Sequence, residues 1–88
     1  GEIFHPSPRV EIDFRGKTAE EMTNLLEKYL DEAVLAGLPY VRIIHGKGTG
    51  KLRQAARQFL LDSPYVKYIE NGKDNEGGEG VTVAHLKV

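Results

Sequence analysis

The segment YVRIIHGKGTGKLRQAARQFL, residues 40–60, decides the fold class of this chain. It opens with a short run of mostly β-branched and aromatic residues, which is typical of a strand. A glycine-rich turn follows, and after it apolar side chains recur at helical spacing, at Leu52, Ala55, Ala56, Phe59 and Leu60. A strand that passes through a tight turn into a helix indicates an α/β domain.

The residues before this segment predict another strand and helix. Residues 10–14 alternate between apolar and polar side chains, as in a strand with one buried and one polar face. Thr18 and Glu21 have the spacing of a capping box, so we expect a helix from there to about Ala36, capped by Gly37. Its apolar stripe comprises Met22, Leu25, Leu26, Tyr29, Leu30 and Ala33.

The residues after the segment predict two further strands. The second helix stops before Ser63-Pro64, a strand covers 65–70, a loop rich in glycine, asparagine and aspartate covers 71–80, and a last strand covers 81–86. The order is βαβαββ, with the last two strands paired as a hairpin. Right-handed crossovers predict parallel neighbours in each strand–helix–strand unit. We therefore expect a two-layer α/β sandwich, in which two helices cover one face of a four-stranded mixed sheet and leave the other face partly open.

Length and composition limit what the chain can be. Its 88 residues fit one domain, and 40% hydrophobic with 28% charged residues exclude a disordered chain. Residues 1–9 contain two prolines and no periodicity, so we expect an extended arm or linker end there and a domain over 10–88. The absence of cysteine excludes disulfides and thiolate chemistry. With no long apolar run and no signal peptide, we expect a cytoplasmic protein without a membrane partner.

Charge is distributed unevenly, although the net charge is only −1. Residues 42–61 contain five basic side chains and no acidic one, whereas residues 18–40 contain five acidic side chains and a single base, Lys28. Such asymmetry places a basic face on a nearly neutral protein. Nucleic acid therefore stays an admissible partner despite the net charge.

The turn at residues 45–50 has the chemistry of a phosphate cradle. Its glycines let the backbone approach a ligand closely and adopt positive φ. The helix that follows offers unpaired N–H groups and the positive end of its dipole. The expected phosphate-binding residues are Gly46, Lys47, Gly48, Gly50, Lys51 and Arg53.

Two nucleotide-binding motifs fail on these residues. The P-loop requires glycine where His45 stands and a hydroxyl residue where Leu52 stands, and Lys51 breaks the dinucleotide fingerprint. The remaining alternative is a plain tight turn with solvated lysines, in which the glycines serve only the backbone geometry.

Three residues at the ends of the first two strands are candidates for catalysis. His45 follows the second strand, where ligands of open α/β sheets bind, and histidine suits proton transfer near neutral pH. Asp13 and Arg15 share one face of the first strand and reach the same edge if the two strands are parallel neighbours. The alternatives are a structural histidine and a solvated ion pair. No spacing indicates a preformed metal cage, and a divalent metal is kept only as an optional cofactor.

Three segments together resemble the signatures of the Smr (small MutS-related) domain family. Ile12-Asp-Phe-Arg-Gly16 is similar to its Leu-Asp-Leu-Arg-Gly motif, His45-Gly-Lys-Gly-Thr-Gly50 matches its His-Gly-x-Gly-x-Gly motif, and Gly77-Gly-Glu-Gly-Val-Thr-Val83 resembles its glycine-rich last strand. The match covers residues 10–86 in the right order. It is most similar to the version that ends the second bacterial MutS paralogue. One departure is His85, where the family leads us to expect glutamate.

The resemblance implies a fold similar to the C-terminal domain of translation initiation factor three. It also implies endonuclease activity, which nicks DNA or cleaves RNA, with Asp13, Arg15 and His45 as the functional residues. The chain would then be one domain of a larger MutS-type protein that suppresses recombination or rescues collided ribosomes. The competing hypothesis is a non-catalytic module that binds DNA, RNA or the ribosome through the same cradle.

Overall fold

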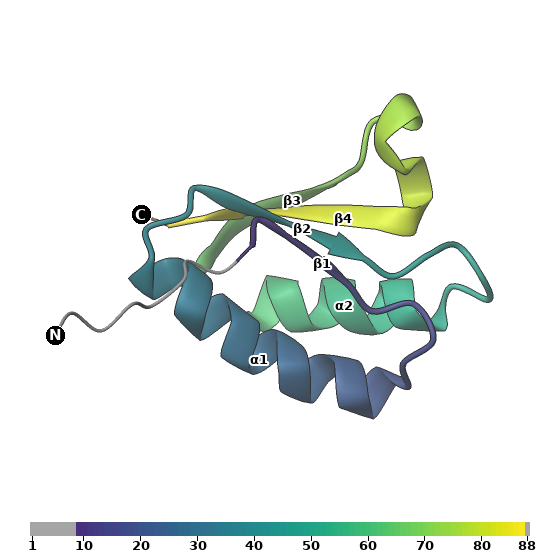
Figure 1. Cartoon of the computed structure of the whole chain (residues 1–88), viewed down its shortest axis with the longest axis horizontal. Helices are drawn as coiled ribbons and strands as arrows, with labels where there is room; N and C mark the ends of the chain where they lie inside the picture. The colour runs from purple at the N-terminus through teal and green to yellow at the C-terminus, as the bar shows by residue number, and fades with distance from the viewer. Residues whose placement is uncertain (1–8, 88) are drawn as a thin grey trace, which may run out of the picture.

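Both helices pack on one face of a four-stranded sheet, as Figure 1 shows. In the computed structural model, which describes residues 9–87, the elements in chain order are β1 (Glu11–Asp13), α1 (Ala19–Leu35), β2 (Tyr40–Ile44), α2 (Lys51–Asp62), β3 (Val66–Asn71) and β4 (Val81–Leu86). The expected βαβαββ order and two-layer α/β sandwich are confirmed. The expected arm at residues 1–9 lies outside the described residues except for Arg9.

Helix α1 begins and ends where its sequence predicts. The Thr18 hydroxyl accepts from the backbone N–H of Glu21 at 3.1 Å, and the Glu21 carboxylate accepts from the backbone N–H of Thr18 at 3.2 Å. Gly37 follows with φ 72°, the left-handed conformation that ends many helices. Leu25 is 44% exposed, so its expected place in the apolar stripe is wrong. The stripe that faces the sheet is narrower and comprises Met22, Leu26, Tyr29, Leu30 and Ala33.

The strand order of the sheet is β1-β2-β4-β3. β1 and β2 are parallel neighbours, and β3 and β4 form the expected antiparallel hairpin. β4 also pairs antiparallel with β2, so it separates β2 from β3. The expectation that β2 and β3 are neighbours is therefore wrong. Burial gives the physical reason, because every residue of β4 except His85 is buried, whereas only Val66 of β3 is buried and β3 suits an edge.

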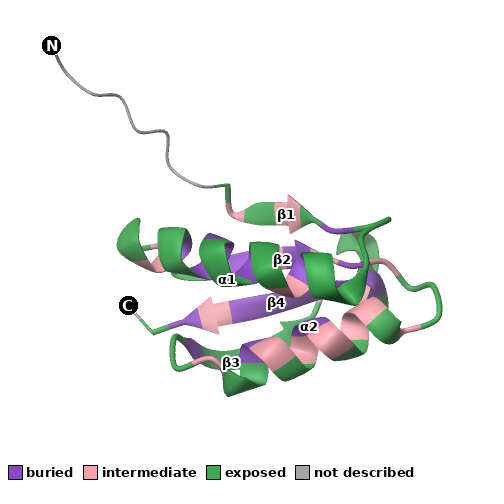
Figure 2. Cartoon of the chain, turned by 90° about the horizontal axis from the view of Figure 1, so that it is seen from below, coloured by how far each residue is buried: buried purple, intermediate pink, exposed green. Residues whose placement is uncertain are grey.

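The hydrophobic core lies between the sheet and the helices, and Figure 2 shows the burial pattern from the helix side. Side chains alternate along each strand, so Val41 and Ile43 of β2 are fully buried, whereas Arg42 between them lies on the open face. The remaining buried members of the core are Phe14, Ala56, Leu60, Val66, Ala84 and Leu86, together with the α1 stripe.

The β3–β4 connection is held by its own hydrogen bonds. Where a long loop was expected, the chain forms two 3₁₀ turns, Asp74–Glu76 and Gly78–Gly80. The Gly72 N–H donates to the carbonyls of Gly78 and Val81, both at 3.1 Å. A Cβ at Gly77 would lie 2.5 Å from the Val81 Cγ2 atom, so glycine there permits close packing of the connection.

Candidate nucleic-acid interface

Three loops meet at one end of the sheet. β1 and β2 end there and β4 begins there, because β4 runs antiparallel to both (Figure 1). This is the carboxyl edge of the parallel pair, where ligands of open α/β sheets bind. Each loop carries one of the three motif segments, residues 12–16, 45–50 and 77–83. The fold therefore gathers into one place the residues that the sequence holds far apart.

The three segments contact one another at two glycines. The backbone N–H groups of His45 and Gly46 both donate to the Gly80 carbonyl, at 3.1 and 2.9 Å. A Cβ at Gly80 would lie 3.4 Å from the Gly46 Cα, and a Cβ at Gly46 would lie 3.3 Å from the Arg15 Cγ. Gly46 also has φ 77°, which disfavours a side chain. These contacts fix the cradle turn against the other two motif segments.

Asp13 holds Arg15 in one orientation at the rim of the site. The Asp13 Oδ1 accepts from the backbone N–H of Arg15 at 2.9 Å and from its Nε at 3.0 Å, while Oδ2 accepts from Nη2 at 2.7 Å. Both side chains are exposed. These hydrogen bonds lower the pKa of Asp13 to about 2, so the carboxylate stays ionised at neutral pH. The pair therefore presents a fixed guanidinium to solvent.

His45 lies under the glycine turn and is only 4% exposed. Its Nδ1 lies 2.9 Å from the Gly46 carbonyl, and its Nε2 lies 2.8 Å from the Thr82 hydroxyl. Since a carbonyl only accepts, both contacts are satisfied when Nδ1 carries the proton and Nε2 accepts from Thr82. Burial lowers the pKa of His45, and the charges of Arg53 and Arg57 act in the same direction against the raising effect of the Gly46 contact. The ring is therefore neutral at pH 7.

The cradle turn and the β1–α1 loop enclose a cleft of about 580 Å³. Residues 15–19 line one wall and residues 45–52 line the other, so Arg15, His45, Lys47 and Lys51 share this cleft. Arg53 does not line it, because its guanidinium turns toward Asn71 at the end of β3. All the expected site residues line the cleft except Arg53 and Asp13. Asp13 lies outside the lining but hydrogen-bonds the cleft residue Arg15.

The two helices that begin at this cleft differ in their readiness for an anion. The N-terminus of α1 is satisfied by its capping box and has acidic residues in its first turn. The N-cap of α2 is Gly50, which offers no side-chain hydrogen bond, and the first turn of α2 has no acidic residue. The Gln54 N–H donates to the Gly50 carbonyl, and ahead of it the Lys51 N–H makes only a long contact of 3.4 Å with the Thr49 hydroxyl, so the first turn of α2 is weakly capped. Of the two helix ends, the α2 terminus is therefore the better suited to an anion.

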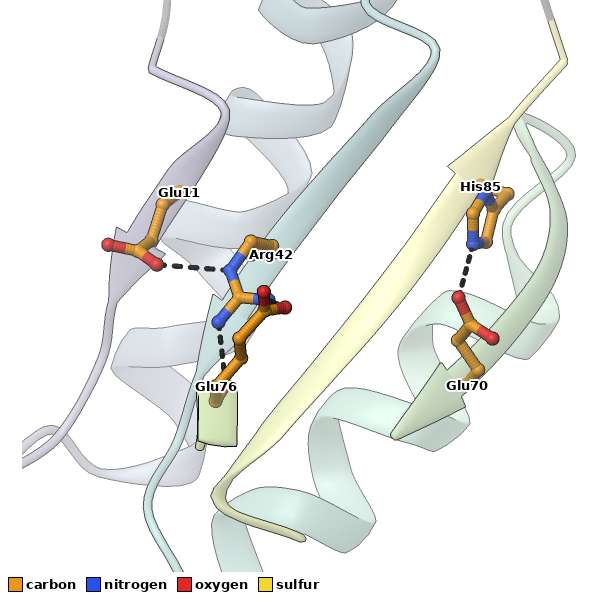
Figure 3. Close-up of polar contacts among 5 residues, drawn as sticks. All are labelled: Glu11, Arg42, Glu70, Glu76 and His85. Atoms are coloured by element: carbon orange, nitrogen blue, oxygen red, sulfur yellow. Dashed lines mark hydrogen bonds and ion pairs between the residues drawn. The ribbon is translucent and has the colours of Figure 1, made fainter. Parts of the chain in front are cut away.

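The open face of the sheet is occupied by ion pairs within the chain, which Figure 3 shows. The Arg42 Nε donates to Glu11 at 3.1 Å, and its Nη2 donates to the Glu76 carbonyl at 2.7 Å. His85 lies 2.8 Å from Glu70. It pairs in register with Tyr40, the first residue of β2, whereas the cradle follows the last residue of that strand. His85, which stands where the family led us to expect glutamate, therefore lies one strand length from the cleft.

Sequence reasoning missed Thr82, whose hydroxyl positions the imidazole of His45. Thr82 is fully buried and is the only hydroxyl in β4, so a threonine between two valines of the last strand was the available signal. Over residues 9–87, no group of three or more His, Cys, Asp or Glu side chains gathers to hold a metal ion. No helix in that part of the chain has the length and apolar character needed to cross a membrane.

A glycine turn that leads into a helix without a side-chain cap, at the carboxyl edge of an open sheet, defines the class: a two-layer α/β domain with a ligand-binding type of edge. The chain belongs to the Smr domain family, whose match covers residues 12–87.

Relatives and solved structures agree with this membership. The chain is 57% identical over 83 residues to the endonuclease MutS2 of Thermomicrobium roseum and 56% identical over 78 residues to that of Geobacillus thermodenitrificans. These matches cover 92% and 89% of this chain but 10% of each relative. The Smr domain of Thermus thermophilus MutS2 has 42% identity and a TM-score of 0.86, covering 89% of this chain and 98% of that one. The stand-alone Escherichia coli protein YdaL, 24% identical with a TM-score of 0.84, shares the fold over 90% of this chain and 65% of its own.

Proposed function

We propose that this domain cleaves phosphodiester bonds in nucleic acid and that the cleft between the two loops holds the scissile phosphate. One observation carries the proposal: Arg15, oriented by Asp13, packs against Gly46 at the mouth of a cleft that contains the uncapped α2 terminus. Backbone N–H groups with Lys47 and Lys51 bind the phosphate in this scheme. The Arg15 guanidinium then stabilises charge as it develops on the phosphorus oxygens.

His45 is the proposed proton carrier, since among residues 9–87 it is the only histidine that lines the cleft. Its Nε2 already accepts a hydrogen bond from Thr82, so proton transfer at this nitrogen requires that bond to open. Burial keeps the imidazole in the neutral form, which is the form that accepts a proton. The Thr82 hydroxyl thus holds the ring in place between turnovers.

The engagement of His45 also favours a second candidate, a non-catalytic module. Both ring nitrogens are bonded and the side chain is nearly buried, as for a histidine that only holds the glycine turn. The same cradle would then anchor DNA, RNA or the ribosome without cleaving it. We propose this role as the alternative if no cleavage is found.

The relatives extend the proposal to the protein that carries the domain. Proteins named endonuclease MutS2 contain the matching segment as about a tenth of their length. We propose that the chain serves as a nuclease-related domain of such a MutS-type protein in the cytoplasm. We also propose that the larger protein suppresses recombination or rescues collided ribosomes. This part of the proposal rests on the family resemblance.

A nicking assay decides between the two candidates. Supercoiled plasmid and a structured RNA are incubated with the wild-type domain and with Arg15→Gln, each with Mg²⁺, with Mn²⁺ and with a chelator. The endonuclease proposal expects cleavage by the wild type that falls by about 10²–10³-fold in the variant. Binding without cleavage of either nucleic acid under any metal condition would support the non-catalytic module. Cleavage that survives the chelator would remove the divalent metal from the mechanism.

A further inference from the structure

Two arginines of α2 converge on one amide at the end of β3. The Arg53 Nη2 donates to the Asn71 Oδ1 at 3.1 Å, and the Arg57 Nη1 donates to the same oxygen at 3.2 Å. Arg53 and Arg57 stand one helical turn apart, so their guanidiniums lie side by side over the same edge of the sheet. Asn71 is exposed, whereas Arg53 and Arg57 are half-buried, so the pair of charges is partly open to solvent.

The positive charge of this pair is not balanced within the described part of the chain. Arginine stays protonated at neutral pH, and an amide oxygen carries only a partial charge. No carboxylate lies within ion-pair distance of either guanidinium over residues 9–87. Arg42 on the open face contrasts with them, because Glu11 and Glu76 neutralise it (Figure 3).

One donor of the pair also lacks a partner. The Arg53 Nε is buried and makes no hydrogen bond in the structure. A buried donor left unsatisfied is costly, as are two like charges held together without an anion. An anion on the solvent side would offset the paired charges, and a small turn of the Arg53 guanidinium toward it would also expose the Nε to an acceptor oxygen.

We propose that Arg53, Arg57 and Asn71 form a second phosphate subsite, which holds a phosphate neighbouring the one in the cradle on the same nucleic-acid strand. The inference rests on the proposed function, because the cradle supplies the first phosphate. Guanidinium groups bind phosphate oxygens in pairs, and the groove that leads from the cradle to these arginines favours a phosphate of the same strand as the occupant.

The surface connects the two subsites. Lys51 lines both the cleft and a shallow groove along α2, and Arg53 and Arg57 line that groove. The other side chains of the groove are uncharged. Arg57 lies about 9 Å along the helix axis from Lys51 at the usual rise per residue. A nucleic-acid backbone that leaves the cleft past Lys51 therefore meets no negative charge before Arg57.

The first test compares Arg57→Gln with Arg57→Lys. Binding of a dye-labelled duplex and of a single-stranded RNA is followed by fluorescence anisotropy over a series of KCl concentrations. Arg57→Gln is expected to lower the slope of log K against log salt by about one and to weaken binding by about tenfold, because one phosphate contact is lost. Arg57→Lys is expected to retain the slope. A wild-type slope in Arg57→Gln would overturn the inference.

Asn71→Asp provides a test in which stability and binding change in opposite directions. The new carboxylate takes the place of the phosphate between the guanidiniums, so the melting temperature should rise while affinity for the duplex falls. Asn75→Asp, the same change on the exposed Asp74–Glu76 turn, is the control for added negative charge. Equal loss of affinity in the two variants would overturn the subsite.

The double variant Lys47→Ala with Lys51→Ala separates this inference from the proposed function. If this variant loses affinity and Arg57→Gln does not, the cradle stands and the second subsite is overturned. If Arg57→Gln loses affinity and the double variant does not, the arginine subsite stands and the proposed cradle fails. Loss in both supports the continuous path past Lys51.

Discussion

Replacing His45 by alanine disturbs the point where the cradle is joined to the last strand. The imidazole links the Gly46 carbonyl to the Thr82 hydroxyl, and its side chain is nearly inaccessible to solvent. His45→Ala therefore removes two hydrogen bonds and leaves a hole beneath the glycine turn. Thr82 is fully buried, so its hydroxyl would have no access to water.

The expected loss of stability follows from these contacts. An unsatisfied buried hydroxyl costs about 1–3 kcal/mol, and the cavity left by a buried side chain adds a cost of similar size. A combined loss of about 3 kcal/mol is a large share of the ~5–15 kcal/mol that a domain possesses. For a domain of this size it corresponds to a fall in Tm of about 12–24 °C.

The same histidine gives the stability a defined pH dependence. Its pKa in the folded state is lowered below the usual 6.5, so at acidic pH the unfolded state binds the proton first. The stabilisation is fully present above pH 6.5 and is lost as pH falls from there through the folded-state pKa. One proton sets the upper limit of this slope, about 1.4 kcal/mol per pH unit. It should be absent in His45→Gln, which has nothing to titrate.

Thermal unfolding measures the fall in Tm, and urea unfolding at a series of pH values measures the pH dependence of stability, both followed by circular dichroism. His85→Gln is the matched control, because His85 lies on the open face and its removal should leave the dependence due to His45 intact. Cleavage is then measured per folded molecule. A loss of about 10²–10⁴-fold in His45→Ala indicates proton transfer, whereas full activity indicates a purely structural histidine. A Tm within a few degrees of wild type would refute the reasoning from burial.

Three further predictions concern the cradle and its rim. Lys47→Ala with Lys51→Ala should lower the salt slope of nucleic-acid binding by about two in anisotropy titrations, and an unchanged slope would remove both lysines from the interface. Gly48 has open space beside it but φ 36°, which strains any side chain, so Gly48→Val should distort the turn and abolish binding while the domain stays folded by circular dichroism; full binding would support a plain turn. Asp13→Asn should lower the cleavage rate by about a hundredfold in the nicking assay with little change in Tm, because the exposed pair orients Arg15 without stabilising the fold. A large fall in Tm would instead assign the pair to stability.

Local sequence patterns predicted the elements because each pattern acts within one segment. The capping box of Thr18 and Glu21 sets the start of α1, and alternation and β-branching give β2 and β4 their observed bounds. The order of the strands was not predictable in this way. Insertion of β4 between β2 and β3 depends on how well an almost entirely buried strand fills the centre of the sheet, which no local pattern reports.

The candidate site likewise has parts that follow from neighbouring residues and parts that depend on long-range contacts. The sequence by itself determined the glycine turn, its lysines and the Asp13–Arg15 pair, because their chemistry lies in neighbouring residues. Only the tertiary structure decided that His45 is held by Thr82 and that Arg53 leaves the cradle to join Arg57 at Asn71. Those contacts span 14 to 37 residues of chain, and they exist because antiparallel pairing of β4 with both β2 and β3 brings three strand ends to one edge.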